Sequence, residues 1–175
     1  MGSSRIERAS SIDLMELASA TTPAAGHVGA VLVLEPGDMD LSTLRVALNE
    51  RIRGVPRLRQ CLRSTPLGCG RPIWVDHTSF DIACHVGEAV CPMPADRASM
   101  LKVAADLVTQ VLPRERPLWS ATLVTGLADG TSALVIVFHH VMADGMGGLA
   151  ALVNLVDGVP LRATPEFPRE APNVT

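Results

Sequence analysis

We predict an α/β fold in which helices flank a mixed β-sheet. Segments with the apolar runs of buried strands alternate along the chain with segments whose apolar residues recur at helical spacing. Two of the expected strands, Leu118–Leu127 and Ser132–Val141, flank the turn Ala128–Thr131, which predicts an antiparallel hairpin. The 175 residues are 47% hydrophobic, which suits one domain with a substantial core.

The first part of the chain predicts a strand followed by two helices. Val28–Leu34 is short and apolar and is typical of a buried strand. Asp40 suits the N-cap of a helix that Gly54 ends. The apolar residues of this helix are Leu41, Leu44, Leu48 and Ile52. Pro56 fits the first turn of another short helix, with Leu58 and Leu62 as its apolar positions.

The second part predicts a strand, an amphipathic helix, the hairpin and a last helix. Phe80, Ile82, Cys84 and Val86 alternate with Asp81, Ala83 and His85, as in a half-buried strand. Ala95–Leu112 carries an apolar stripe at helical spacing. After the hairpin, Met146–Val156 is expected to be a helix. The domain organisation that follows is a flexible N-terminus over 1–10, a domain over 11–158 and a proline-rich linker or tail over 159–175.

The overall composition excludes several classes of protein. The 15 basic and 18 acidic residues leave a net charge of −3, which argues against a nucleic-acid partner. No apolar run is long enough to cross a bilayer, and the N-terminus lacks the apolar stretch of a secretory signal, so a cytoplasmic location is expected. The four cysteines form no C-x-x-C pair, which favours reduced structural thiols over a zinc site.

The stretch HHVMADG, residues 139–145, contains the candidate site. Consecutive strand residues point to opposite faces, so His139 and His140 are not expected to hold one metal together. We expect one ring to face a packed layer and the other to face a cleft. A histidine there can exchange protons near neutral pH. A metal site using His140 and Asp144 lacks an evident third ligand, and no metal is predicted.

Asp144 and Gly145 follow the pair across an expected bend. The Asp144 carboxylate would orient an imidazole or pair with an arginine that braces the loop, and Gly145 removes a Cβ beside the site. The spacing alone also fits a structural histidine pair followed by an ordinary Asp-Gly turn or helix cap. His27, His77 and His85 are isolated in the sequence and are interpreted as surface or hydrogen-bonded residues.

HHVMADG fits H-H-x-x-x-D-G, the motif of a superfamily that includes chloramphenicol acetyltransferase and peptide-synthetase condensation domains. The chain as a whole resembles the bacterial wax ester synthase/diacylglycerol acyltransferase family, from about Ser11 to the tail. The segments that carry this resemblance are, in order, Ser11–Leu14, Gly26–Gly29, Pro56–Gln60, Pro72–Val75, Phe80–Ile82 with His85, and Arg116–Trp119. The fold implied is one half of a chloramphenicol-acetyltransferase-like fold.

The resemblance implies an O-acyltransferase that moves a fatty acyl group from acyl-CoA to a long-chain alcohol or to diacylglycerol, in wax ester or triacylglycerol synthesis. By the family pattern His140 is the general base, Asp144 holds the loop, Gly145 leaves room, and His139 completes the motif. Acyl-CoA is then a substrate, and no permanently bound cofactor is expected.

Members of this family are more than twice as long as this chain, which matches their first half. The resemblance therefore implies a partner, either a C-terminal half-domain or a second copy, and a site peripheral to a membrane or lipid inclusion. Two alternatives stay open. One is a non-catalytic fragment that binds lipid or a partner protein, and the other is a condensation-type domain that uses a carrier-bound thioester.

Overall fold

A computed structural model describes residues 7–19, 25–37, 39–142 and 167–168. The α-helices are α1 (Ser11–Ser19), α2 (Leu41–Arg51) and α3 (Arg97–Val108). The strands are β1 (His27–Leu34), β2 (Gln60–Arg63), β3 (Ile73–Asp76), β4 (Val86–Val90), β5 (Trp119–Thr125) and β6 (Ser132–His139). Four short 3-10 turns are η1 (Ile52–Gly54), η2 (Pro56–Arg59), η3 (Ile82–Cys84) and η4 (His140–Met142). The expected helix Met146–Val156 lies outside the described residues.

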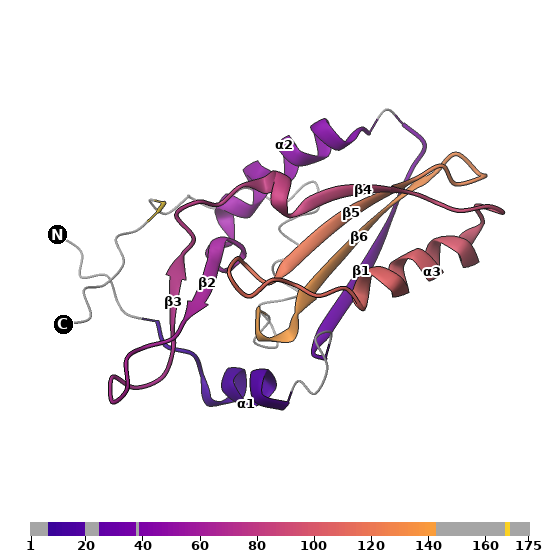
Figure 1. The fold of residues 1–175 in the computed structure, drawn as a ribbon. Coiled ribbons are helices and arrows are strands. Elements are labelled where there is room, and N and C mark those ends of the chain that lie inside the picture. Colours follow the sequence, from indigo (N-terminus) through magenta and orange to yellow (C-terminus); the bar gives the residue numbers. More distant parts are fainter. Residues whose placement is uncertain (1–6, 20–24, 38, 143–166, 169–175) are drawn as a thin grey trace.

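Within the described residues, the main sheet has four strands in the order β1-β6-β5-β4 (Figure 1). β6 pairs antiparallel with both β1 and β5, whereas β4 pairs parallel with β5. The sheet is therefore mixed, and the predicted fold class and the hairpin between β5 and β6 are confirmed. All five residues over 133–137 of β6 are buried, which shows that both faces of this strand are covered.

Helices pack on the sheet at two places. α2 contacts β4 and α3 lies along β1 and β6 (Figure 1). Gly29 makes the second contact possible, because a Cβ at this position would lie 2.5 Å from Cγ2 of Val108. The absent side chain thus lets the C-terminal end of α3 approach β1 closely. Among the described residues, no helix is long and apolar enough to cross a membrane.

Two helix starts follow from local signals in the sequence. Asp40 accepts a hydrogen bond from the Thr43 backbone N–H and caps α2, as predicted. Asp96 caps α3 in the same way through Ser99. α3 starts later than the expected Ala95, because Ala95 has a positive φ of 60° that a helix does not accommodate, and it ends at Val108, before the expected Leu112.

The strand expected over Phe80–Val86 is wrong in its first part. The carboxylate of Asp81 accepts the Ala83 N–H and starts the turn η3, so β4 begins only at Val86. Asx turns of this kind compete with strand pairing over short distances. The alternating pattern reflects tertiary contacts of the turn, in which Phe80 and Ile82 pack against the core.

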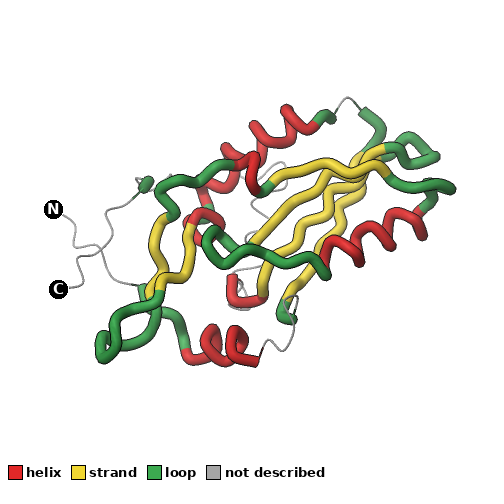
Figure 2. Tube along the Cα trace, in the orientation of Figure 1, coloured by secondary structure: helices red, strands yellow, loops and turns green. Residues whose placement is uncertain are grey.

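The region after α2 also differs from the expectation. Pro56 does begin a helical turn, but η2 ends at Arg59, and Leu62 lies in β2. β2 pairs antiparallel with β3 in a separate two-stranded sheet, set apart from the main sheet (Figure 2). Neither β3 nor α1 was predicted. β3 has only four residues, and the nine residues of α1 show weak apolar periodicity, so both give little signal in the sequence.

Residues 7–10 fall within the expected flexible N-terminus, yet they are held against β3. Arg8 forms an isolated antiparallel β-bridge with Ile73. The backbone N–H of Ala9 donates to the Pro72 carbonyl oxygen, and that of Trp74 donates to the Glu7 carbonyl oxygen. Ala9 is fully buried. Residues 7–10 therefore do not behave as the flexible terminus expected from the sequence, because backbone hydrogen bonds hold them beside β3.

The core is built mainly from aliphatic side chains of β5 and β6 together with α2 and α3. Its largest fully buried side chains include Ile52, Val86, Leu123, Val124, Val135 and Val137. A buried histidine, His85, interrupts this apolar layer between the rings of Phe80 and Trp119, at centroid distances of 5.1 and 4.6 Å. Its Nδ1 lies 2.9 Å from the Trp119 carbonyl oxygen, so Nδ1 carries the proton and donates.

We expect the free energy of unfolding to decrease as the pH falls through about 6.5, where histidines of the unfolded chain take up protons. Burial lowers the pKa of His85 and of His139, so both rings stay neutral in the folded chain at pH values where the unfolded chain binds protons. The decrease continues until the folded-state pKa values are passed. Urea unfolding at about pH 7.5 and about pH 5.5 measures it, and His85→Asn should reduce the difference. If His85→Asn leaves the difference in the free energy of unfolding between the two pH values unchanged, His85 does not contribute to the pH dependence.

Candidate functional site

The histidine pair lies where β6 ends and η4 begins, and the two rings differ in exposure. His139 is the last residue of β6 and is only 5% exposed, whereas His140 opens the turn and is exposed. His139 is the ring in the packed layer, as predicted for one of the pair, whereas His140 lies beyond the strand in η4, and a cleft in front of it stays a prediction. His140 is thus the exposed member of the pair.

The surroundings of His139 define its protonation state. Its Nδ1 lies 3.1 Å from the backbone nitrogen of Val141, which can only donate. Nδ1 must therefore be unprotonated, and the ring is the neutral tautomer with its proton on Nε2. Burial is the main cause that lowers the pKa of His139, and the nearby His27 lowers this pKa further. His139 consequently acts as a neutral acceptor that holds the first turn of η4.

The backbone of His140 is fixed by β1 on the other side. Its N–H donates to the Gly26 carbonyl oxygen at 2.6 Å, one residue before β1 begins. Gly26 has a φ of +83°, in the region that favours glycine. A Cβ here would lie 3.2 Å from Cε1 and 3.3 Å from Nε2 of His139. The absence of a side chain at Gly26 therefore makes room for the buried ring.

We expect Gly26→Ala to destabilise the chain by about 1–3 kcal/mol, from backbone strain and from crowding of the His139 ring. Urea unfolding measures this loss, and amide exchange of His140 should show that its bond to the residue 26 carbonyl is weakened. Gly130→Ala is the matched control, because its φ is +78° and nothing lies within 4 Å of an added Cβ. Equal losses in the two variants would mean that strain alone accounts for the effect.

His27 joins the pair from β1, although the sequence shows it as isolated. The β1–β6 register places His27 opposite His139. Their rings meet edge to face, with centroids 5.7 Å apart and an interplanar angle of 75°. His27 Nδ1 lies 2.9 Å from the carbonyl oxygen of Val108, the last residue of α3, and donates to it. Sequence reasoning missed this contact because it depends on strand register across more than 100 residues.

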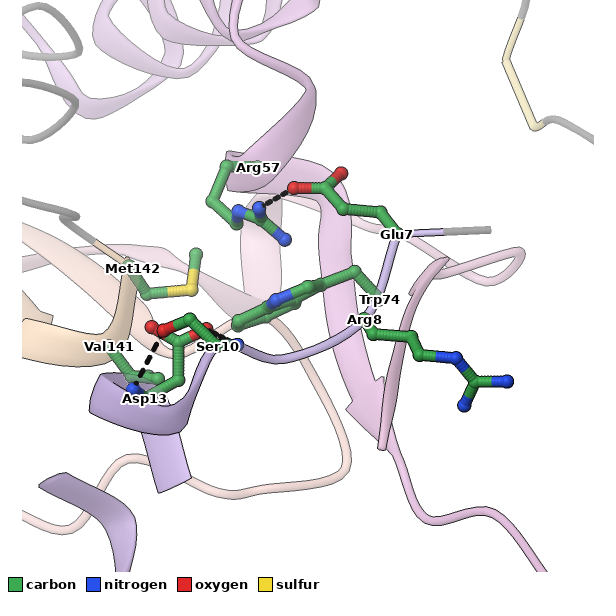
Figure 3. A pocket seen from close by; sticks show the side chains of 8 residues that line it. All are labelled: Glu7, Arg8, Ser10, Asp13, Arg57, Trp74, Val141 and Met142. Atoms are coloured by element: carbon green, nitrogen blue, oxygen red, sulfur yellow. Dashed lines mark hydrogen bonds and ion pairs between the residues drawn. The ribbon is translucent and has the colours of Figure 1, made fainter. Parts of the chain in front are cut away.

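A polar pocket of about 110 Å³ adjoins the other side of the turn (Figure 3). Val141 and Met142 of η4 line it together with Glu7, Arg8, Ser10, Asp13, Arg57 and Trp74. Arg57 pairs with Glu7, and its guanidinium lies 4.0 Å from the centroid of the Trp74 ring. Arg8 extends away from the other side chains and donates to the carbonyl oxygens of Cys69 and Arg71. Among the described residues that line the pocket, His140 does not occur.

Two of the four predicted site residues, Asp144 and Gly145, lie outside the described residues. The structure brings His139 and His140 to the end of β6 and adds Gly26 and His27 to them. The segment Gly26–Gly29 contributes to the family resemblance, so the sequence did mark this region. The resemblance indicated no role for Gly26 or His27.

Comparison with solved structures defines the class of the fold. The chain superposes on the first condensation domain of the calcium-dependent antibiotic synthetase with a TM-score of 0.70 at 18% identity, covering 93% of this chain and 40% of that one. It superposes on the wax ester synthase/diacylglycerol acyltransferase from Marinobacter aquaeolei VT8 with a TM-score of 0.64 at 26% identity, covering 82% and 36%. The fold is therefore one half of a chloramphenicol-acetyltransferase-like fold, as predicted.

Sequence comparison then defines the family. The sequence-family model of the wax ester synthase/diacylglycerol acyltransferase catalytic domain matches residues 10–175, and the chain belongs to this family. A protein of Mycobacterium tuberculosis named as a probable diacylglycerol O-acyltransferase is 36% identical over 130 residues, which are 74% of this chain and 28% of that protein. A second, named as a putative diacylglycerol O-acyltransferase, is 34% identical over 176 residues, 96% of this chain and 37% of that protein. The chain thus spans about a third of the length of these relatives.

Proposed function

We propose that the chain provides the catalytic-histidine half of an O-acyltransferase that moves a fatty acyl group from acyl-CoA to a long-chain alcohol or diacylglycerol. The observation that carries the proposal is the exposed ring of His140, held on a turn whose backbone is bonded on both sides. The chain's membership of the wax ester synthase/diacylglycerol acyltransferase family supports the choice of reaction class.

In the proposed reaction His140 is a general base. Its ring nitrogen takes the proton of the acceptor hydroxyl while the oxygen attacks the thioester carbonyl. The tetrahedral intermediate then breaks its carbon–sulfur bond, and the imidazolium returns the proton to the leaving thiolate. An ester and free coenzyme A result, and no oxidant, metal or bound cofactor is consumed. A positioned base of this kind contributes about 10²–10⁴-fold to the rate.

The other motif residues have supporting roles in the proposal. His139 stays neutral and holds the Val141 N–H, which keeps the turn closed beneath His140. Asp144 would brace the loop that follows, and Gly145 would leave space for the reacting groups. Acyl-CoA enters as a substrate, and the chain needs no metal for the step described.

The proposal includes a partner and a lipid surface. The chain spans 28% and 37% of the length of the two Mycobacterium tuberculosis relatives described above. A C-terminal half-domain or a second copy would supply the opposite wall of the site. α1 contacts the turn η4 and exposes Ile12 and Met15, each more than 60% accessible. Exposed apolar side chains beside a site are suited to a partner or to lipid. We place the protein in the cytoplasm, peripheral to a membrane or lipid inclusion.

Release of free thiol from acyl-CoA, with and without hexadecanol or dioleoylglycerol, tests the function. The chain is assayed alone and after it has been mixed with the C-terminal part of a relative. Thiol release that depends on the acceptor supports the proposal. Turnover with a carrier-protein thioester and none with acyl-CoA would favour condensation-type chemistry. Binding of acyl chains with no transfer to any acceptor would favour the non-catalytic fragment.

A further inference from the structure

His27, which lies outside the H-H-x-x-x-D-G motif, makes contact with the buried member of the histidine pair. It projects from the first residue of β1 and lies opposite His139 in the strand register. Directly opposed residues of antiparallel strands project to the same face, and here the two rings meet at a centroid distance of 5.7 Å. The contact joins segments of the chain that are 112 positions apart in sequence numbering, from 27 to 139.

The hydrogen bonds of the two rings fix complementary tautomers. His27 donates from Nδ1 to the Val108 carbonyl oxygen, so its Nε2 is unprotonated when the ring is neutral. His139 accepts at Nδ1 from the Val141 N–H, so its proton is on Nε2. Neither ring can change tautomer without the loss of a backbone hydrogen bond. The ring orientation of His139 is thereby set from α3 through His27 and from η4 through Val141.

We infer that His27 is a positioning residue, which anchors the His139 ring to the C-terminal end of α3 and thereby holds the turn that presents His140. The inference rests on the proposed function, because it assigns His27 a role at the same site. The Val108 carbonyl is one of the last acceptors of α3 and has no partner within the helix, so His27 also completes the helix end. Gly29 allows this approach, since its missing side chain admits Val108.

Protonation of His139 would disrupt this arrangement. A proton on Nδ1 would face the Val141 N–H, so the hydrogen bond between His139 and the backbone of η4 would be lost. The groups around the ring mostly oppose such protonation: His27, Arg114 and His140 lower the pKa of His139, and Glu16 raises it, while burial is the largest cause and lowers it. His27 thus contacts the His139 ring and also disfavours its protonation.

The test compares three substitutions in the 175-residue chain by NMR. His27→Asn retains a donor at the Nδ1 position, His27→Leu removes it, and His77→Asn is the control, a half-buried histidine on the segment that follows β3. The observables are the amide exchange of Val141 and the titration of the His139 ring. We expect His27→Leu to speed Val141 exchange by about fivefold to tenfold, His27→Asn to restore most of the protection, and His77→Asn to change nothing.

Rescue of Val141 protection by His27→Asn separates positioning from mere packing, and the titration reports the electrostatic effect of His27 on His139. His27→Asn should raise the pKa of His139 towards its ordinary value because a neutral amide replaces a ring that can carry charge. An unchanged Val141 exchange in His27→Leu, or a His27→Asn variant that exchanges as fast as His27→Leu, would overturn the inference.

Both NMR readouts are independent of catalysis, so a chain that transfers no acyl group would defeat the proposed function and leave this inference testable. If transfer is observed, His27→Leu should lower kcat by about tenfold to 10²-fold with little change in KM for acyl-CoA.

Discussion

His140→Ala is expected to lower acyl transfer by about 10²–10⁴-fold while the fold is retained. The ring is exposed, and its backbone N–H still donates to Gly26 after the substitution. Loss of an exposed side chain away from the core usually changes the free energy of unfolding by no more than about 0.5 kcal/mol. Thiol release from acyl-CoA in the presence of an alcohol acceptor measures the loss, and urea unfolding confirms that the fold is intact.

The matched control for this substitution is His77→Ala, which removes a half-buried imidazole on the segment after β3. The control should retain turnover, because its backbone N–H bonds to Arg59 and its ring is not part of the site. Full turnover in His140→Ala would show that the ring is not the base. A pH–rate profile adds a second readout, because a histidine base gives activity that falls as the ring is protonated.

Leu123→Ala is expected to reduce the free energy of unfolding by about 2–5 kcal/mol. Leu123 has no exposed surface and lies in β5, where it faces Leu134 of β6 and Glu88 of β4 in the strand register. Neighbouring strands on both sides prevent the sheet from closing over the cavity. Such a loss is a large part of the about 5–15 kcal/mol that stabilises an ordinary domain.

Urea unfolding followed by tryptophan fluorescence measures this effect, with Trp119 of β5 as a reporter within the core. The matched control is Val33→Ala on β1, because that side chain is 62% exposed. We expect a change of less than about 0.5 kcal/mol in the control. A loss of less than about 1 kcal/mol in Leu123→Ala would mean that the layer around β5 repacks to fill the cavity, contrary to the expectation for a close-packed core.

Elements with strong local signals were predicted well from sequence. Asp40 caps α2 because a carboxylate at this position meets free N–H groups of the first helical turn. The apolar runs of β1, β5 and β6 also predict strands, and the short turn between the last two predicts their antiparallel pairing. In each case the cause lies within a few residues of the element, so the sequence alone contains the information. The prediction that Val28–Leu34 is buried is wrong, because β1 is an edge strand among the described strands and none of its residues is buried.

Elements decided by distant contacts were not predicted. Period-two alternation over Phe80–Val86 does not distinguish a strand from a turn whose side chains pack on the core, and Asp81 selects the turn. The pairing of Glu7–Ala9 with β3 likewise depends on a neighbour more than 60 positions away. Loop closure over such distances depends on the whole packed structure and leaves little trace in a local pattern.

By itself the sequence indicated that two adjacent histidines lie where a buried strand ends, and the alternation of side chains along a strand predicted that the two rings differ in burial. Only the tertiary structure decided that His139 is the buried ring, that it is neutral with its proton on Nε2, and that His27 lies against it. The physical reason is register. The partners of a side chain across a sheet are chosen by how distant strands align, and that alignment follows from packing of the whole core.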